Sequence, residues 1–193
     1  MKRICIAAGH TPDWVGCSKN GIKEYTTCRR IAGSLQNMLR ERHDFEVFEV
    51  KGKLHEKVDE INSISPDCAI EIHLGNTNTS ISGARAFYSD GRSRQLAEAL
   101  LDGCEWVLNS SSRFSGVGWW MKITPQMARE KYPDHKAKID LFLAKTMCDA
   151  VIIEPFYISS QSDVELLGPQ HNLVSLALYT GILRFFGGDY NGD

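Results

Sequence analysis

The sequence lacks the features that mark membrane-spanning, secreted and nucleic-acid-binding chains. No stretch approaches the roughly twenty consecutive apolar residues that a membrane span needs, and the apolar run Ile4–Ala8 is too short for a signal-peptide core. The 22 basic and 24 acidic residues are interspersed, so no basic stripe runs along the chain. We therefore expect a chain made in the cytoplasm without a signal peptide, with no stable membrane insertion and no nucleic-acid partner.

Cysteine pairs at metal-knuckle spacing, internal repeats and low-complexity linkers are absent as well. Cys5, Cys68 and Cys148 lie in or beside apolar runs, so we expect the six cysteines to be free and mostly buried thiols. The chain has 193 residues, of which 42% are hydrophobic and 24% charged. This size and composition predict one globular domain over residues 1–193.

Apolar runs typical of strands alternate with stretches of helical periodicity. This alternation predicts an α/β fold, with a single mostly parallel (mixed) sheet and helices on both faces. The segment Ser110–Pro133 is expected to be loop and lid, with a short helix opening at Thr124–Pro125. The expected strands span residues 4–8, 45–50, 68–72, 84–88, 139–143 and 150–153, and the expected helices span residues 24–42, 54–64, 93–108 and 172–186.

Polar side chains stand where three of the predicted strands end. His10 follows the first strand, His73 ends the run that begins at Ala69, and Glu154 ends the run that begins at Val151. Ligands of open α/β sheets bind outside the carboxyl ends of the strands, and Glu24 opens a helix at the same edge. Two histidines and a carboxylate form a ligand set of catalytic zinc. Each residue alone is more often structural, so the combination carries the prediction.

The remaining histidines compete with this set. His43 and His55 lie in charged surroundings that flank helices, His135 lies among lysines and an aspartate, and His171 starts the closing helix. We expect His43, His55 and His135 to lie on the solvent-exposed surface rather than to bind a metal. Glu71 alternates with isoleucines, and the pattern leaves open whether it faces a neighbour across the sheet or the floor of the site.

Four spaced motifs resemble those of the zinc-dependent N-acetylmuramoyl-L-alanine amidases, the third amidase type, which bacteria and phages use on peptidoglycan. The motifs are Ala8–His10, Gly21–Glu24, Ile72–His73 and Glu154–Ser159, and they follow the family's order over nearly the whole chain. Asn76, Gly83 and Asp163 accompany them.

The resemblance implies that His10, Glu24 and His73 bind one zinc ion and that Glu154 is the catalytic acid. It implies hydrolysis of the amide between N-acetylmuramic acid and L-alanine, with peptidoglycan as the partner. A compact phage endolysin that reaches the cell wall after release is the expected role. The chain departs from the family at Thr11–Trp14, where a glycine pair is usual, and Met121–Lys138 looks expanded, so the rim of the site differs.

Two other functions fit the same ligand set. One is another zinc amidohydrolase or carboxypeptidase that acts on peptides, because the ligands do not choose the scissile bond. The other is a non-catalytic wall-binding module of the same fold, against which the intact Glu154 argues. Trp119, Trp120 and Tyr132 are candidates for a glycan-stacking platform, although aromatic residues in such stretches more often pack in the interior.

Overall fold

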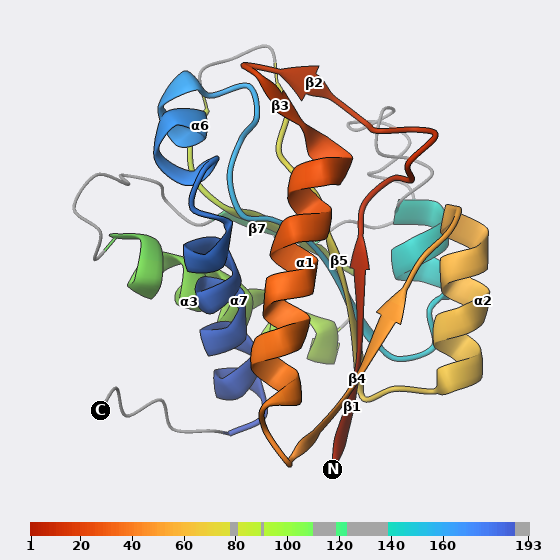
Figure 1. The fold of residues 1–193 in the computed structure, drawn as a ribbon. Coiled ribbons are helices and arrows are strands. Elements are labelled where there is room, and N and C mark those ends of the chain that lie inside the picture. Colours follow the sequence, from red (N-terminus) through yellow and green to blue (C-terminus); the bar gives the residue numbers. More distant parts are fainter. Residues whose placement is uncertain (78–80, 90, 110–118, 123–138, 188–193) are drawn as a thin grey trace.

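The computed structural model describes residues 1–77, 81–89, 91–109, 119–122 and 139–187. A six-stranded sheet forms its centre (Figure 1). Four neighbouring strands are parallel, and β6 runs antiparallel to β8 and parallel to β7. In spatial order the strands are β4 (Phe45–Val50), β1 (Lys2–Ala8), β5 (Cys68–Ile72), β8 (Asp149–Glu154), β6 (Arg85–Tyr88) and β7 (Trp119–Lys122).

Helices cover both faces of this sheet, as Figure 1 shows. One face carries α1 (Glu24–Arg40), α3 (Gly91–Asn109) and α7 (His171–Phe185). The other carries α2 (Leu54–Ile64) and the short π-helix η2 (Ile139–Leu143). The α/β fold predicted from the sequence, with its mostly parallel mixed sheet, is therefore confirmed. The hairpin of β2 (Ser18–Lys19) and β3 (Ile22–Lys23) and the helix α6 (Gln161–Leu167) lie at one end of the sheet.

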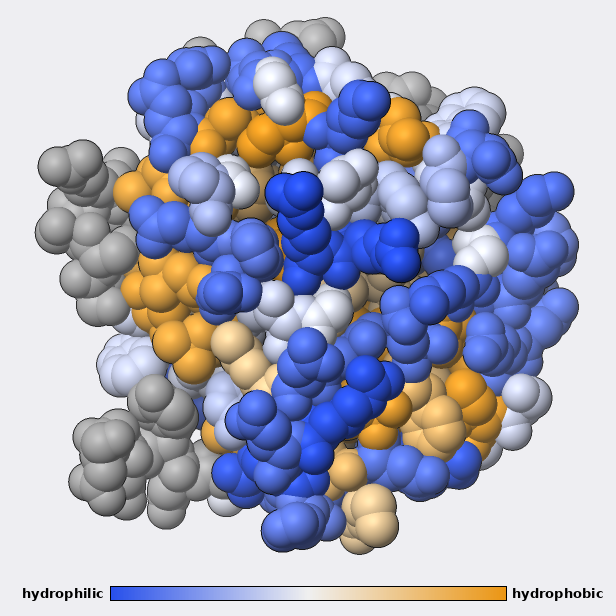
Figure 2. Space-filling view, in the orientation of Figure 1, coloured by the Kyte–Doolittle hydropathy of each residue, from blue (hydrophilic) through white to orange (hydrophobic). Residues whose placement is uncertain are grey.

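Alternating side chains of the central strands divide the core into two apolar layers. Ile6, Ile70 and Ile153 face the α1, α3 and α7 layer, whereas Cys5 and Ile152 face α2 and η2. Successive residues of a strand point to opposite faces, so a central strand covered on both sides must be apolar throughout. Figure 2 shows the corresponding outer surface, where hydrophilic side chains lie over α1 and α2.

Two of the predicted elements differ from the structure. Ile139–Leu143 was expected to be a strand and forms η2, in which Phe142 and Leu143 are buried against α2. A short, mostly apolar segment fits a buried helical turn as well as a strand, because a fully buried segment shows neither the helical nor the strand period of apolar residues. Within Ser110–Pro133, expected to be loop, residues 119–122 form the edge strand β7, and the helix expected at Thr124–Pro125 lies outside the described residues.

No helix in the described part of the chain has both the length and the apolar character that crossing a membrane requires.

All six cysteines lie in the described residues and are free, as predicted. Burial raises the pKa of the Cys5 and Cys104 thiols to about 12, so both react slowly as nucleophiles at neutral pH. We expect a thiol reagent to label all six cysteines in denatured, unreduced protein, and chiefly the partly exposed Cys17 and Cys148 in native protein. Fewer than six thiols after denaturation would contradict this expectation.

Candidate metal centre and active site

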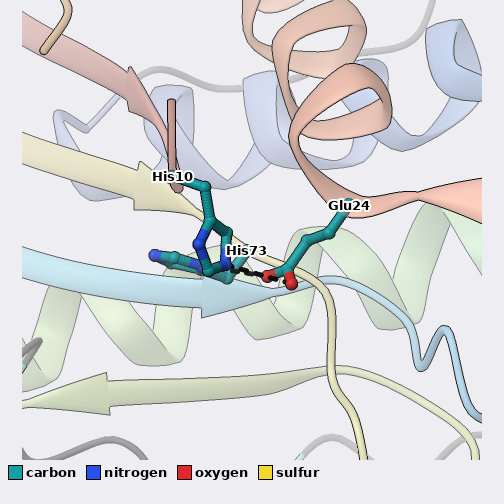
Figure 3. Close-up of side chains that lie close together, drawn as sticks. All are labelled: His10, Glu24 and His73. Atoms are coloured by element: carbon teal, nitrogen blue, oxygen red, sulfur yellow. Dashed lines mark hydrogen bonds and ion pairs between the residues drawn. The ribbon is translucent and has the colours of Figure 1, made fainter. Parts of the chain in front are cut away.

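Two histidines and a glutamate meet at the carboxyl edge of the sheet (Figure 3). His10 lies two residues beyond β1, His73 follows β5 directly, and Glu24 is the first residue of α1. One potential ligand atom from each residue lies within 4.8 Å of the other two. Among the histidine, cysteine, aspartate and glutamate side chains of the described residues, these three form the one group close enough to share a metal ion. The structure thus brings together the three predicted ligand residues.

The Glu24 carboxylate lies between the two imidazoles. Its Oε2 atom is 3.0 Å from Nε2 of His10, and its Oε1 atom is 3.0 Å from Nδ1 of His73. The backbone N–H of Cys17 donates to Oε2 at 2.9 Å, and that of Leu74 donates to Oε1 at 3.2 Å. Hydrogen bonds from the rigid backbone therefore hold both carboxylate oxygens in place. The two rings are 5.0 Å apart and nearly perpendicular.

Two glycines allow the backbone to approach this group. A Cβ atom on Gly9 would lie 2.1 Å from the His73 ring, and one on Gly16 would lie 2.5 Å from His10 and 2.6 Å from Glu24. Gly16 also has a φ of +71°, which favours glycine. His10 itself has a φ of 69°, an uncommon conformation for a residue with a side chain. Such backbone strain is typical of functional sites, where the surrounding structure holds it.

A β-hairpin that the sequence analysis did not identify places Glu24. It turns at Asn20 and Gly21, whose φ angles of 51° and 76° are both positive, and Glu24 begins α1 directly after its second strand. Asn-Gly is the strongest short-range hairpin signal, so the sequence contained the information. The Asn20 side chain donates to the Ile158 carbonyl at 2.9 Å, which ties the hairpin to the segment after β8.

The donor set suits zinc. Imidazole nitrogen and carboxylate oxygen are preferred zinc ligands, and three protein ligands are typical of catalytic zinc sites. The His73 and Glu24 side chains are 2% and 5% exposed, whereas that of His10 is 15% exposed, so the group opens toward solvent on the His10 side. His43, His55 and His171 are not part of the group, and His135 lies outside the described residues.

The predicted catalytic acid, Glu154, lies on the strand beside His73. The register pairs Ile72 with Ile153, and the His73 N–H donates to the Ile153 carbonyl at 2.8 Å. Residues in register point to the same face of a sheet, so the side chains of His73 and Glu154 extend from neighbouring strands on one face. The Glu154 side chain is 1% exposed.

An arginine that the sequence analysis missed holds Glu154. Arg85 stands opposite Glu154 in the antiparallel β6–β8 pair, and its Nε donates to Oε2 of Glu154 at 2.9 Å. Its guanidinium also lies 4.7 Å from the Phe87 ring centre and 5.3 Å from that of Tyr157. The ion pair and the two rings fix the orientation of the Glu154 carboxylate.

The structure also answers the question that the sequence left open for Glu71, whose side chain faces the site. Its Oε2 atom lies 3.2 Å from Nε2 of His73, and its Oε1 atom accepts a hydrogen bond from the Lys57 ammonium at 2.9 Å. Burial alone would raise the pKa of the Glu71 carboxyl, but the contacts with His73 and Lys57 outweigh burial and lower the pKa.

A cavity of about 640 Å³ adjoins the group of His10, Glu24 and His73, which is called the metal group below. Its size falls within the usual range of ligand sites. Trp14 lies on the wall of the cavity, and 73% of its surface is exposed. It ends a turn that begins at Thr11, and two backbone hydrogen bonds, each 3.1 Å long, join these two residues. The rim segment Thr11–Trp14 therefore shapes the mouth of the cavity. His10, Pro12, Leu54, Lys57, Glu71 and His73 also line it.

Asp163 joins the loops that border the site. Its Oδ2 atom accepts from the backbone N–H of Tyr157 at 2.9 Å and of Gly83 at 3.2 Å. Its Oδ1 atom accepts from the hydroxyl groups of Ser160 and Ser82. This aspartate therefore has a structural role at the start of α6. The candidate platform of Trp119, Trp120 and Tyr132 falls on side chains outside the described part of the chain.

Several solved structures share the fold. The N-acetylmuramoyl-L-alanine amidase AmiC2 of Nostoc punctiforme superposes with a TM-score of 0.79 at 16% identity, covering 96% of this chain and 97% of that one. The CwlV amidase catalytic domain from Bacillus (Paenibacillus) polymyxa var. colistinus gives a TM-score of 0.75 at 18% identity, with 98% and 100% covered. The catalytic domain of the CD27L endolysin, which targets Clostridia difficile, gives a TM-score of 0.71 at 20% identity, with 95% and 98% covered.

Sequence comparison identifies the family. No match was found among the curated proteins. The family model described as N-acetylmuramoyl-L-alanine amidase matches residues 4–184, a span that contains His10, Glu24, His73 and Glu154. The chain therefore belongs to the N-acetylmuramoyl-L-alanine amidase family.

Proposed function

We propose that this chain is a zinc-dependent peptidoglycan amidase that cleaves the bond between N-acetylmuramic acid and L-alanine. The family supplies the enzyme class and the substrate. The observation that carries the metal assignment is the close group of His10, Glu24 and His73, with its ligand atoms within 4.8 Å of one another. These residues would hold one ion, and the facing atoms are Nε2 of His10, the Glu24 carboxylate and Nδ1 of His73.

The chemistry divides between the metal group and Glu154. When bound there, zinc would lower the pKa of a coordinated water to about 7 and polarise the amide carbonyl. Glu154 accepts a proton at its carboxylate as the water oxygen bonds to the carbonyl carbon, and it returns the proton to the alanine nitrogen as the C–N bond breaks. The cleavage leaves a carboxylate on the lactyl group of the sugar and a free amine on L-alanine.

Arg85 orients the proposed catalytic acid, and the adjoining cavity borders the two histidines of the metal group. The guanidinium holds one carboxylate oxygen of Glu154, which limits the directions in which the acid can move. The cavity beside His10 and His73 gives a peptide or sugar chain access to the metal group.

Mass spectrometry of digested, purified peptidoglycan tests the scissile bond. We expect zinc-loaded protein to release intact stem peptides that begin with L-alanine, together with peptide-free glycan chains. Release of single carboxyl-terminal amino acids would instead identify a carboxypeptidase. No product from protein that has bound zinc would identify a wall-binding module.

We further propose that the chain acts as an endolysin, made in the cytoplasm and active on the wall after release. The fold that it shares with the CD27L catalytic domain supports this role. Cells that express the chain should grow until the membrane is permeabilised and should then lyse. Lysis that does not depend on permeabilisation would contradict the proposal.

A further inference from the structure

A buried ion pair that the proposed chemistry does not use lies behind the metal group. The Lys57 ammonium from α2 is 2.9 Å from Oε1 of Glu71 on β5, and the two side chains are 3% and 1% exposed. Lys57 also donates to the Ala8 carbonyl at 2.6 Å and lies 3.4 Å from the His10 carbonyl. Burying two charges carries a large desolvation cost, so such a pair is weak evidence for stability. Its position points to a role in the site.

The pair reaches the metal group through His73. The His73 ring lies between two carboxylates, with Nδ1 3.0 Å from Glu24 and Nε2 3.2 Å from Glu71. A neutral imidazole carries its proton on one nitrogen, and the other nitrogen is then the metal ligand. With Nδ1 facing Glu24, zinc bound there would leave the proton on Nε2, which lies 3.2 Å from Oε2 of Glu71.

We propose that Glu71 is a positioning residue that fixes the tautomer and ring orientation of His73 for zinc, and that Lys57 holds Glu71 in place. This inference rests on the proposed function, since it assumes that zinc binds at the group. Metal-bound histidines commonly donate their second N–H to a carboxylate, and loss of that partner typically weakens metal binding by about 10- to 100-fold. Lys57 contacts Glu71 on the strand that leads to His73, and it also contacts the carbonyls of Ala8 and His10. One ammonium therefore supports the segments that carry both histidines.

Two matched double variants separate positioning from packing. Lys57→Met/Glu71→Gln removes both charges but keeps a carbonyl oxygen that can accept the His73 Nε2 proton. Lys57→Met/Glu71→Leu removes the charges and the acceptor with a side chain of similar size. Replacing a buried ion pair by apolar groups is often neutral or stabilising, so both variants should fold. Both lose the Lys57 contacts, so the difference between them isolates the acceptor.

The readout is the zinc dissociation constant, measured by competition with a chelator. We expect both variants to bind zinc more weakly than wild type, because both lose the Lys57 contacts, and the leucine variant to bind zinc about 10- to 100-fold more weakly than the glutamine variant. Nitrogen-15 NMR of the imidazoles should show a protonated Nε2 on His73 in the zinc-loaded wild type and glutamine variant.

Three results would overturn the inference. Equal zinc dissociation constants in the two variants, whether tight or weak, would show that the acceptor at position 71 is irrelevant. Protonation of His73 at Nδ1 in the zinc-loaded wild type would do the same. The first two results would contradict this inference alone. Failure of the wild-type chain itself to bind zinc would contradict the proposed function as well, so the two failures can be told apart.

Discussion

His73→Ala is expected to leave the chain without stoichiometric zinc and without measurable hydrolysis of peptidoglycan. The substitution removes one of the three proposed zinc ligands, and two remaining donors are too few to hold a catalytic ion. It also leaves the carboxylates of Glu24 and Glu71 without the imidazole that separates them. His10→Ala should have the same effect on zinc. Metal analysis after gel filtration measures the loss.

His43→Ala is the matched control, because His43 is exposed and lies outside the metal group. It should bind zinc and cleave peptidoglycan as the wild type does. Near-stoichiometric zinc in folded His73→Ala or His10→Ala protein would show that the wrong histidines have been assigned. Circular dichroism establishes that each variant is folded.

Glu154→Gln should lower turnover by about 100-fold or more while zinc content stays at the wild-type level. Glutamine keeps the size of the side chain but cannot accept the proton of the attacking water, and general acid–base catalysis typically contributes about 10²- to 10⁴-fold. The substitution also leaves Arg85 without its buried counter-charge, so we expect a lower melting temperature. Turnover is therefore compared at a temperature well below both transitions.

The outcomes of Glu154→Gln separate three roles for this residue. Retained zinc with slow turnover assigns the proton transfer to Glu154. Loss of zinc would make Glu154 a fourth ligand. Unchanged turnover would leave Glu154 as the structural partner of Arg85 and would contradict the proposed mechanism. A partly exposed control, Glu98→Gln, removes a carboxylate that pairs with Arg94 at 2.7 Å and should leave turnover unchanged.

The sequence predicts the edge of the sheet where the site lies because that prediction depends on local patterns. Buried parallel strands appear as apolar runs, and the residues that follow them must lie at one edge. His10, His73 and Glu154 were identified in this way, and Glu24 came from the start of a helical period. Local patterns failed for Ile139–Leu143, where five residues, four of them apolar, fit a buried helical turn as well as a strand.

The supporting residues could not be predicted, because each depends on a contact between distant segments. Arg85 meets Glu154 across an antiparallel pair, and the sequence contains no sign that β6 reverses direction between two neighbours. Lys57 belongs to a helix with many charged side chains, and the packing of α2 on the sheet buries its ammonium against Glu71. A lysine in such a helix is normally exposed, so its sequence context favoured the wrong environment.

Zinc titration of metal-free protein tests the central claim most directly. Chelator-treated protein receives increasing amounts of zinc, and the rate at which new amino-terminal alanine appears in purified peptidoglycan is measured at each step. We predict no activity in metal-free protein, a linear rise with added zinc, and a plateau at one equivalent, because we propose a single ion for the group of His10, Glu24 and His73. Full activity in thoroughly metal-free protein would contradict the claim.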